Sequence, residues 1–303
     1  MNGIDRLRLA LRRLLRAPVG LVLQSLEPRF ASRARHQLAI CAIFREEARF
    51  LEEWISFHLG VGVTHFYLYN NFSTDNFRDV LAPWIDRGIV TLTDWPRPVG
   101  QLSAYRHCLK RARRECRWLA FIDIDEFLFS PGTTDIRPVL AGYAERPGLE
   151  VWELFFGSDG HRARPALSVT EAYRKRAPLT RHSAKTICNP RLVYKLGVHQ
   201  CKYWLGQALD TARRPIGPGR EPVLDRLRIN HYWSRSIEDL ETKIARNDAS
   251  TAQTRSADWH FAFEKTLNAE FDDAILPIVR RIRAGAGAGG ASPRARSDQI
   301  ESI

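Results

Sequence analysis

The chain has 303 residues, of which 44% are hydrophobic and 10% aromatic; this supports one large α/β domain or two small ones and argues against global disorder. Its 46 lysines and arginines exceed its 34 acids, for a formal net charge of +12. This charge indicates nucleic acid, an acidic membrane surface or a phosphorylated substrate as a partner, unless the arginine content only reflects a biased genome. No run of about 18 apolar residues occurs, so we expect no transmembrane helix.

Residues 1–37 form a basic segment in which leucines and arginines interleave up to Arg16. This pattern favours a helix, and Pro18 and Gly20 then precede a short apolar run. The run is too short for a signal peptide and lacks an obvious cleavage site. Two alternatives remain for residues 1–24. They make peripheral contact with the inner face of a membrane, or they form a helix that packs on the protein body or frays.

The five cysteines are odd in number and form no CxxC pair. Several lie in or beside apolar runs, so we predict reduced core residues in a cytoplasmic protein.

From Leu38 onward, short apolar runs alternate with amphipathic stretches. We predict strands at 38–44, 64–69, 89–92 and 118–124, and helices at 46–59, 77–85 and 103–114. This alternation predicts the α/β class, with a mainly parallel sheet covered by helices on both faces. Ligands bind such sheets beyond the carboxyl ends of the strands, so the polar loop 70–75 and the acids after residue 122 should lie at the functional edge.

The second half is less regular, with predicted strands at 150–156 and 226–233 and a helix that begins at the capping residue Ser236 and ends near Arg246. We predict loops at 170–189 and 211–222, and disorder at 284–303, which is rich in glycine and alanine. The domain prediction is a basic segment (1–37), a main domain (38–283) with halves at 38–130 and 131–283, and a tail (284–303).

The strongest chemical signal is a predicted buried strand that ends in three acids, Asp123, Asp125 and Glu126. Side chains alternate along a strand, so Asp123 and Asp125 should point to the same side, about 7 Å apart. Two like charges at a sheet edge repel unless a cation lies between them. A divalent cation would accept a carboxylate together with phosphate oxygens and would stabilise a diphosphate leaving group as a Lewis acid. The alternative is an acidic strand end that is merely solvated.

Two other functions compete with this interpretation. A haloacid-dehalogenase-type phosphohydrolase also ends an apolar strand in this pattern, with the first aspartate, here Asp123, as nucleophile. Such enzymes usually carry Thr or Val where this chain has Phe127, and their motif lies near the start of the fold. A non-enzymatic nucleic-acid binder is suggested by the charge alone, and no nucleic-acid motif is present, so we expect no nucleic-acid partner.

The chain resembles glycosyltransferase family 92 and the related family-2-like group over roughly residues 38–250. The motifs that carry the resemblance occur in the family's order at 43–54, 62–71, 73–75, 118–128 and 229–236. The resemblance implies a GT-A fold, a nucleoside-diphosphate sugar donor and usually manganese, with magnesium as the alternative. We therefore expect transfer of a hexose to a glycan or lipid-linked acceptor hydroxyl, with inversion, in bacterial glycan biosynthesis.

The resemblance also implies the donor-binding residues. Arg45 and Glu46 would line the nucleotide pocket, and Asn70 and Asn71 stand where the family often has Asp-Asn. Asp75 contacts the ligand or, with Ser73, caps the following helix. The remaining candidates are Asp123 itself and four residues of two predicted helices: Gln101, Tyr105, Lys243 and Arg246. For Tyr105 the alternative is core packing, and for Lys243 and Arg246 it is a solvated helix face.

Further residues are candidates for the third metal ligand and for the general base. Together with Asp123 and Asp125, His231 is the candidate third metal ligand and His199 its rival, since neutral imidazole is a common ligand. Inverting transfer needs a carboxylate that accepts the acceptor proton, and Asp159 and Glu171 are the candidates. Asp159 has an alternative role in forming a turn.

Overall fold

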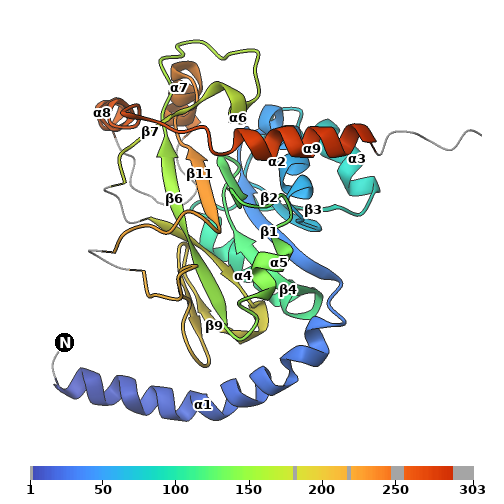
Figure 1. The fold of residues 1–303 in the computed structure, drawn as a ribbon, viewed down its shortest axis with the longest axis vertical. Coiled ribbons are helices and arrows are strands. Elements are labelled where there is room, and N and C mark those ends of the chain that lie inside the picture. The colour runs from blue at the N-terminus through green and yellow to red at the C-terminus, as the bar shows by residue number, and fades with distance from the viewer. Residues whose placement is uncertain (1–2, 180–182, 217–219, 247–255, 289–303) are drawn as a thin grey trace, which may run out of the picture.

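The computed structural model describes residues 3–179, 183–216, 220–246 and 256–288. A helix, α1 (Gly3–Ala31), runs below the body of the protein (Figure 1). The next elements alternate as predicted: β1 (His36–Phe44), α2 (Ala48–Gly60), β2 (His65–Asn70), α3 (Phe77–Asp86), β3 (Val90–Asp94), α4 (Gln101–Glu115) and β4 (Cys116–Phe121).

The second half holds short strands and helices. They are β5 (Glu126–Phe129), α5 (Arg137–Ala141), β6 (Gly148–Phe156), α6 (Val169–Ala172), β7 (Lys175–Arg176), β8 (Ala184–Cys188), β9 (Val193–Leu196), β10 (Cys201–Tyr203), β11 (Arg228–Tyr232), α7 (Ile237–Arg246), α8 (Ala257–Lys265), β12 (Glu270–Phe271) and α9 (Leu276–Ala288). The prediction of a loop at 170–189 is wrong, because this stretch contains α6, β7 and β8. The basic residues of this stretch had suggested a loop. In the structure, β8 contains Lys185, which is buried.

The main sheet has the order β12-β7-β6-β8-β4-β1-β2-β3, with β11 paired to both β6 and β5. Strands β3, β2, β1 and β4 are parallel, so their carboxyl ends meet at one edge. Strand β8 pairs antiparallel with both β4 and β6, which makes β6 parallel to β4. The predicted α/β fold with a parallel first half is therefore confirmed, and antiparallel pairing enters only with the second half.

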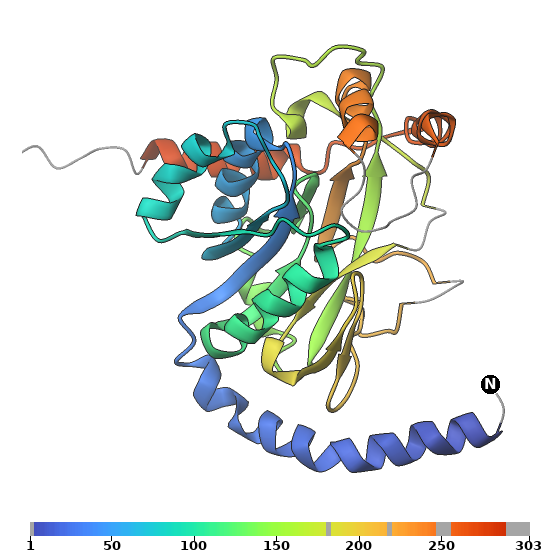
Figure 2. The same ribbon diagram turned by 180° about the vertical axis from the view of Figure 1, so that it is seen from behind.

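Both faces of the sheet are covered. Along β1, Leu38, Ile40 and Ala42 pack into one core while Ala39 and Cys41 pack into the other, as the two-residue period of a strand requires. The first core lies beneath α2, α3 and α9, and the second lies beneath α4, which is in front of the sheet in Figure 2. All five cysteines are free, and only Cys201 is partly exposed.

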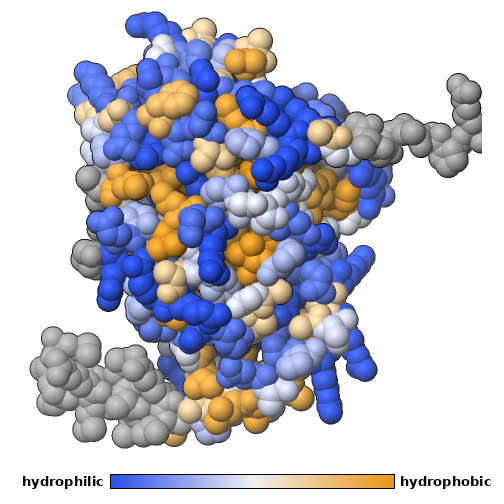
Figure 3. All heavy atoms as spheres, viewed as in Figure 1, coloured by the Kyte–Doolittle hydropathy of each residue, from blue (hydrophilic) through white to orange (hydrophobic). Residues whose placement is uncertain are grey.

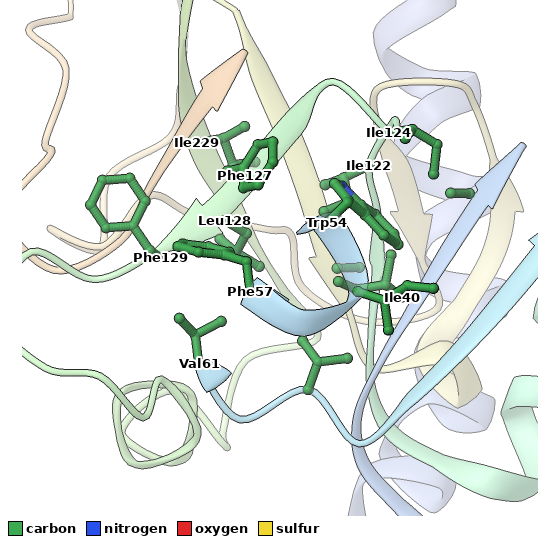
Figure 4. Close-up of a cluster of buried hydrophobic side chains, with 14 of the residues drawn as sticks. Ile40, Trp54, Phe57, Val61, Ile122, Ile124, Phe127, Leu128, Phe129 and Ile229 are labelled. Atoms are coloured by element: carbon green, nitrogen blue, oxygen red, sulfur yellow. The ribbon is translucent and has the colours of Figure 1, made fainter. Parts of the chain in front are cut away.

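One aromatic cluster sets the position of β5. Phe57 of α2 and Phe127 of β5 lie with ring centroids 5.2 Å apart, and Figure 4 shows them beside Phe129 and Trp54. The indole Nε1 of Trp54 donates to the carbonyl oxygen of Glu126 at 2.8 Å. The core thereby holds the backbone that follows the acidic run.

The helix after β11 begins with the predicted cap. The Ser236 hydroxyl donates to Asp239 Oδ2 at 2.7 Å, and the Asp239 N–H donates back to Ser236 Oγ at 3.1 Å. At the other end of the chain, α9 extends to Ala288, five residues into the tail predicted from Ala284; residues 289–303 lie outside the described residues. None of the described helices has the length and apolar run that a bilayer span needs.

Candidate functional site

The acidic run lies in a turn and not on a strand. Strand β4 ends at Phe121, and Asp123 and Asp125 precede β5. The turn is closed by the Glu126 N–H, which donates to the Asp123 carbonyl, and by the Asp123 N–H, which donates to Glu126 Oε2, both at 3.1 Å. The prediction of a strand to residue 124 with both aspartates on one side is therefore wrong. The turn directs the two carboxylates to different partners.

Asp123 faces α4 and β8. Its Oδ1 accepts from Gln101 Nε2 at 3.1 Å and from the Tyr105 hydroxyl at 3.3 Å, and its Oδ2 lies 2.7 Å from Lys185 Nζ. The Asp123 side chain is 28% exposed, against 12% for Asp125. Gln101 and Tyr105, two predicted donor-site residues, are thus brought to the first acid by the start of α4.

Asp125 faces the second half of the chain. Its Oδ2 lies 2.8 Å from Lys243 Nζ on α7 and 3.3 Å from His231 Nε2 on β11. Strand β11 pairs with β5 so that His231 stands opposite Glu126. The other imidazole nitrogen, Nδ1, contacts Glu153 of β6 and lies 3.4 Å from Glu126 Oε1. The tertiary structure therefore brings His231 and Lys243 to the turn.

We call Asp123, Asp125, Glu126 and Glu153 the acid cluster. Three cationic side chains contact it: Lys185, which lies 2.8 Å from Glu126, together with His231 and Lys243. Burial lowers the pKa of His231, but the carboxylates of Asp125 and Glu153 raise it to about 10. Burial opposes ionisation of Asp125, yet Lys243 and His231 hold its pKa well below the usual range.

Lys185 is shared by two of these carboxyl groups, at 2.7 Å from Asp123 and 2.8 Å from Glu126. Burial raises the pKa of Glu126 well above its usual range, against the attraction of Lys185. Glu126 is thus the member of the acid cluster that keeps a proton most readily. A cation bound here would replace the proton of the His231 imidazole, because the ring binds a metal only in its neutral form.

Among the described residues, Asp125, Glu126 and His231 form a group whose ligand atoms all lie within 4.8 Å of one another. Two carboxylate oxygens and one imidazole nitrogen are a donor set that fits a divalent ion such as manganese or magnesium. This group contains Glu126 in place of the predicted Asp123, and His231 in place of its rival His199. Glu126 was noted in the sequence as the third acid of the run, but it was not among the predicted metal ligands.

The predicted loop residues are bonded within the protein. Asn70 Nδ2 donates to Asp94 at 2.9 Å, and Asn71 Nδ2 donates to the carbonyl oxygens of Trp95 and Arg97 at 2.9 and 3.0 Å. Asp75 accepts from the N–H of Ala48, the first residue of α2, at 2.8 Å. It therefore bonds to the start of the preceding helix, α2. We had expected it either to contact the ligand or to cap the following helix, α3.

The loop after β1 is held by α7. Arg246 Nη1 donates to the carbonyl oxygens of Arg45 and Glu46 at 2.5 and 3.1 Å, and its Nη2 pairs with Glu47. Glu46 Oε1 accepts from the N–H of Thr74 at 2.6 Å. Of the two α7 cations predicted to meet a diphosphate, Lys243 reaches the acid cluster, whereas Arg246 is fixed to this loop.

The two predicted bases have other partners. Asp159 lies 3.1 Å from Lys175 Nζ, and its backbone φ of 50° places it in a turn. Glu171 pairs with Arg283 of α9 at 2.6 Å, and hydrogen bonds from Arg283 and Ser168 lower its pKa to about 2. A carboxylate with so low a pKa is a weak proton acceptor, so the structure argues against Glu171 as the base.

Two cavities lie near the acid cluster. The smaller, of about 30 Å³, is lined by Asp125 and Lys243 together with residues of the loops after β1 and β11. The larger, of about 640 Å³, lies between α2, the 164–170 segment and α9. Both are lined by Arg49, Phe50, Arg164 and Asp239, so the two cavities are adjacent.

Comparison with known proteins shows which family the chain belongs to. The model of glycosyltransferase family 92 matches residues 36–255, and the chain belongs to this family. A family 92 protein of Oryza sativa subsp. japonica is 38% identical over 234 residues, 75% of this chain and 38% of the relative. The galactan beta-1,4-galactosyltransferase GALS2 of Arabidopsis thaliana is 28% identical over 189 residues, 55% of this chain and 36% of the relative. The chain thus spans less than half the length of these relatives.

Among solved structures, Staphylococcus aureus TarS 1-349 in complex with UDP is similar, with 12% sequence identity and a TM-score of 0.36 over 52% of this chain and 47% of that one.

These findings confirm the predicted family, and the parallel strands of the structure agree with the predicted α/β fold class. They remove the support for a phosphohydrolase that uses Asp123 as nucleophile. The named sequence relatives are plant proteins, from Oryza sativa, Ricinus communis and Arabidopsis thaliana, which contradicts our prediction of a bacterial source.

Proposed function

We propose that the protein transfers a hexose from a nucleoside-diphosphate sugar to a hydroxyl group of a glycan or lipid-linked acceptor, with inversion at the sugar carbon. The observation that carries this proposal is the acid cluster at the carboxyl edge of the parallel strands, where such sheets bind ligands. In this proposal residues 38–130 bind the nucleotide and residues 131–283 bind the acceptor.

Asp125, Glu126 and His231 would hold the cation, Mn²⁺ or Mg²⁺, with Asp123 adjacent. The ion would stabilise the negative charge that develops on the departing diphosphate. The chain's own residues supply two further functions. Lys243, bonded to Asp125, places a second positive charge at the same position, and Gln101 and Tyr105 fix the orientation of Asp123.

The substitution Asp125→Asn tests this function. It removes a candidate metal ligand and the charge that holds Lys243, and we expect turnover of the nucleotide-sugar donor to fall by about a hundredfold or more. In thermal-shift titrations with manganese and a panel of nucleotide sugars, we expect the unsubstituted protein to be stabilised by the metal and Asp125→Asn to lack this stabilisation. The matched control is Asp135→Asn, which removes an exposed aspartate paired with Arg137. Unchanged turnover and metal response in Asp125→Asn would disprove the assignment.

Peripheral attachment to the inner face of a membrane is a separate proposal, and it places the protein in the cytoplasm. One side of α1 is anchored to the body: Glu27 pairs with Arg117 at 2.8 Å, and the Arg16 guanidinium lies 4.0 Å from the Tyr194 ring centroid. A neighbouring stripe of α1, at helical spacing, is apolar and exposed: Leu15, Val19, Val22 and Leu26. Figure 3 shows apolar side chains at the bottom of the molecule, where α1 lies.

An apolar stripe on an arginine-rich helix suits an anionic lipid surface. We expect the protein to sediment with vesicles that contain anionic lipid, and the double substitution Leu15→Ser, Val22→Ser to reduce the bound fraction severalfold. Equal binding to purely zwitterionic vesicles, or no loss on substitution, would refute this attachment.

A further inference from the structure

The small cavity beside Asp125 is lined by two residues whose buried hydrogen-bond donors have no partner among the described residues. Its volume of about 30 Å³ leaves room for roughly two oxygen-sized atoms. Ser234 and Arg235, the two residues that follow β11 and Trp233, both line it. The two residues are 1% and 5% exposed, so bulk water hardly reaches them.

Arg235 is held in a fixed orientation. Its Nη1 donates to Glu47 Oε2 at 2.7 Å, and its guanidinium lies 3.5 Å from the centroid of the Phe50 ring. Its backbone φ of 53° lies in the left-handed region, which is unfavourable for a residue with a long side chain. The chain therefore holds this guanidinium in one place at a conformational cost.

The free edge of that guanidinium is its Nε and Nη2 side. Both nitrogens are buried, and neither has a hydrogen-bond partner among the described residues; the same is true of the Ser234 hydroxyl. Nε–H and Nη2–H point in parallel from one edge of the guanidinium, and this arrangement matches two oxygens of a phosphate or carboxylate group. Buried donors without partners are rare and unfavourable, which indicates that a ligand completes them.

The charge around the cavity favours an anion. Five cationic residues line it against three acids: Arg49, Arg164, Arg235, Lys243 and Arg246 against Glu46, Asp125 and Asp239. Burial lowers the pKa of Arg235, but Glu47 and Asp125 raise it above its ordinary value, so the guanidinium stays charged.

We propose that Ser234 and Arg235 form a phosphoryl subsite, in which the free edge of Arg235 and the Ser234 hydroxyl bind oxygens of the donor's diphosphate. This inference rests on the proposed function. The diphosphate is favoured over an anionic acceptor because the cavity is lined on one side by Asp125 and Lys243 and on the other by Glu46, which follows β1. The subsite would also hold the diphosphate as it departs from the sugar.

The test is binding of inorganic pyrophosphate to the whole protein by calorimetry, in the presence of manganese. Arg235→Lys keeps the positive charge but removes the two parallel N–H donors of the guanidinium. We expect it to bind pyrophosphate about tenfold more weakly. Ser234→Ala removes one donor and should weaken binding by several-fold to about tenfold. Arg137→Lys, at an exposed pair with Asp135, is the matched control and should bind like the unsubstituted protein. Thermal melting of each variant separates lost binding from lost folding.

Glucuronate is titrated as the alternative anion. Weaker pyrophosphate binding in both variants, with folding retained, supports the subsite. Unchanged pyrophosphate affinity overturns it, and so does a loss confined to glucuronate, which would indicate an acidic acceptor. If Asp125→Asn abolishes turnover while the Arg235 and Ser234 variants bind pyrophosphate normally, only this inference fails. If Asp125→Asn leaves turnover intact, the proposed function itself fails.

Discussion

Two groups of polar side chains lie at the carboxyl edge of the same parallel strands, and they differ in what satisfies them. In the first, which we call the loop brace, Asn71 and Asp75 bond to backbone carbonyl and N–H groups of the neighbouring loop and helix. In the acid cluster, Asp123, Asp125 and Glu126 bond mainly to side chains from β8, β11 and α7. A buried backbone group that loses such a side chain can be left without a hydrogen bond. A lysine, in contrast, can move away from a carboxylate when a ligand takes the place of the lysine.

This difference predicts which group supports the fold and which supports chemistry. Loss of a loop-brace residue should reduce the free energy of unfolding through orphaned backbone groups. Loss of an acid-cluster carboxylate should mainly reduce activity. The cations inside the acid cluster are the exception, because they neutralise buried acids.

The largest effect on stability should come from Lys185→Met. Lys185 is 3% exposed and lies 2.7 and 2.8 Å from Asp123 and Glu126. Its loss removes the cation that Asp123 and Glu126 share, and we expect the free energy of unfolding to fall by about 3 kcal/mol. Manganese should raise the melting temperature of this variant more than that of the unsubstituted protein, because the ion supplies the lost charge. Lys195→Met, on the exposed part of β9, is the control, and an equal melting temperature for the two variants would contradict the prediction.

Asn71→Ala should have the next largest effect. Asn71 is 3% exposed, and the substitution removes both hydrogen bonds that its amide donates, to the carbonyl oxygens of Trp95 and Arg97. We expect a loss of about 2 kcal/mol in urea unfolding, with donor turnover changing less than in Asp125→Asn. Asn76→Ala removes an exposed amide that makes no capping hydrogen bond and should change stability by less than about 0.5 kcal/mol. A turnover loss in Asn71→Ala as large as that in Asp125→Asn would break the distinction between the two groups.

The smallest effect concerns Glu171 and Arg283, which lie away from both groups. The pKa of Glu171 is lowered to about 2, so the pair stabilises the folded state above the ordinary pKa of 4.5, and this contribution disappears as the pH falls through about 2. The pair is partly exposed, with 28% and 57% of the two side chains accessible, and we expect no more than about 1 kcal/mol. Urea unfolding of Glu171→Gln should show this deficit at pH 6 and none near pH 2. A deficit that persists at pH 2, or one shared by the exposed control Glu241→Gln, would count against the pair.

The comparison also explains which site residues were predictable. Asp123, Asp125 and His231 stand next to apolar runs, and the resemblance placed them in order along the chain. Lys185 and Glu153 gave no such signal, and Arg235 lies within the motif at 229–236 but was not predicted as a site residue. Lys185 lies in a basic stretch for which the sequence predicts a loop. In the structure it belongs to strand β8 and is buried against carboxylates that are distant in sequence.

The sequence by itself determined the alternation of strands and helices up to residue 121, the α/β class, the family and the acidic run after the fourth strand. These features depend on local periodicity and on motifs that are contiguous in the chain. Only the tertiary structure decided that Asp123 and Asp125 face different partners, that Glu126 joins Asp125 and His231, and that Asp75 caps α2. Each of these depends on pairing between segments 27 to 118 residues apart, which no local pattern encodes.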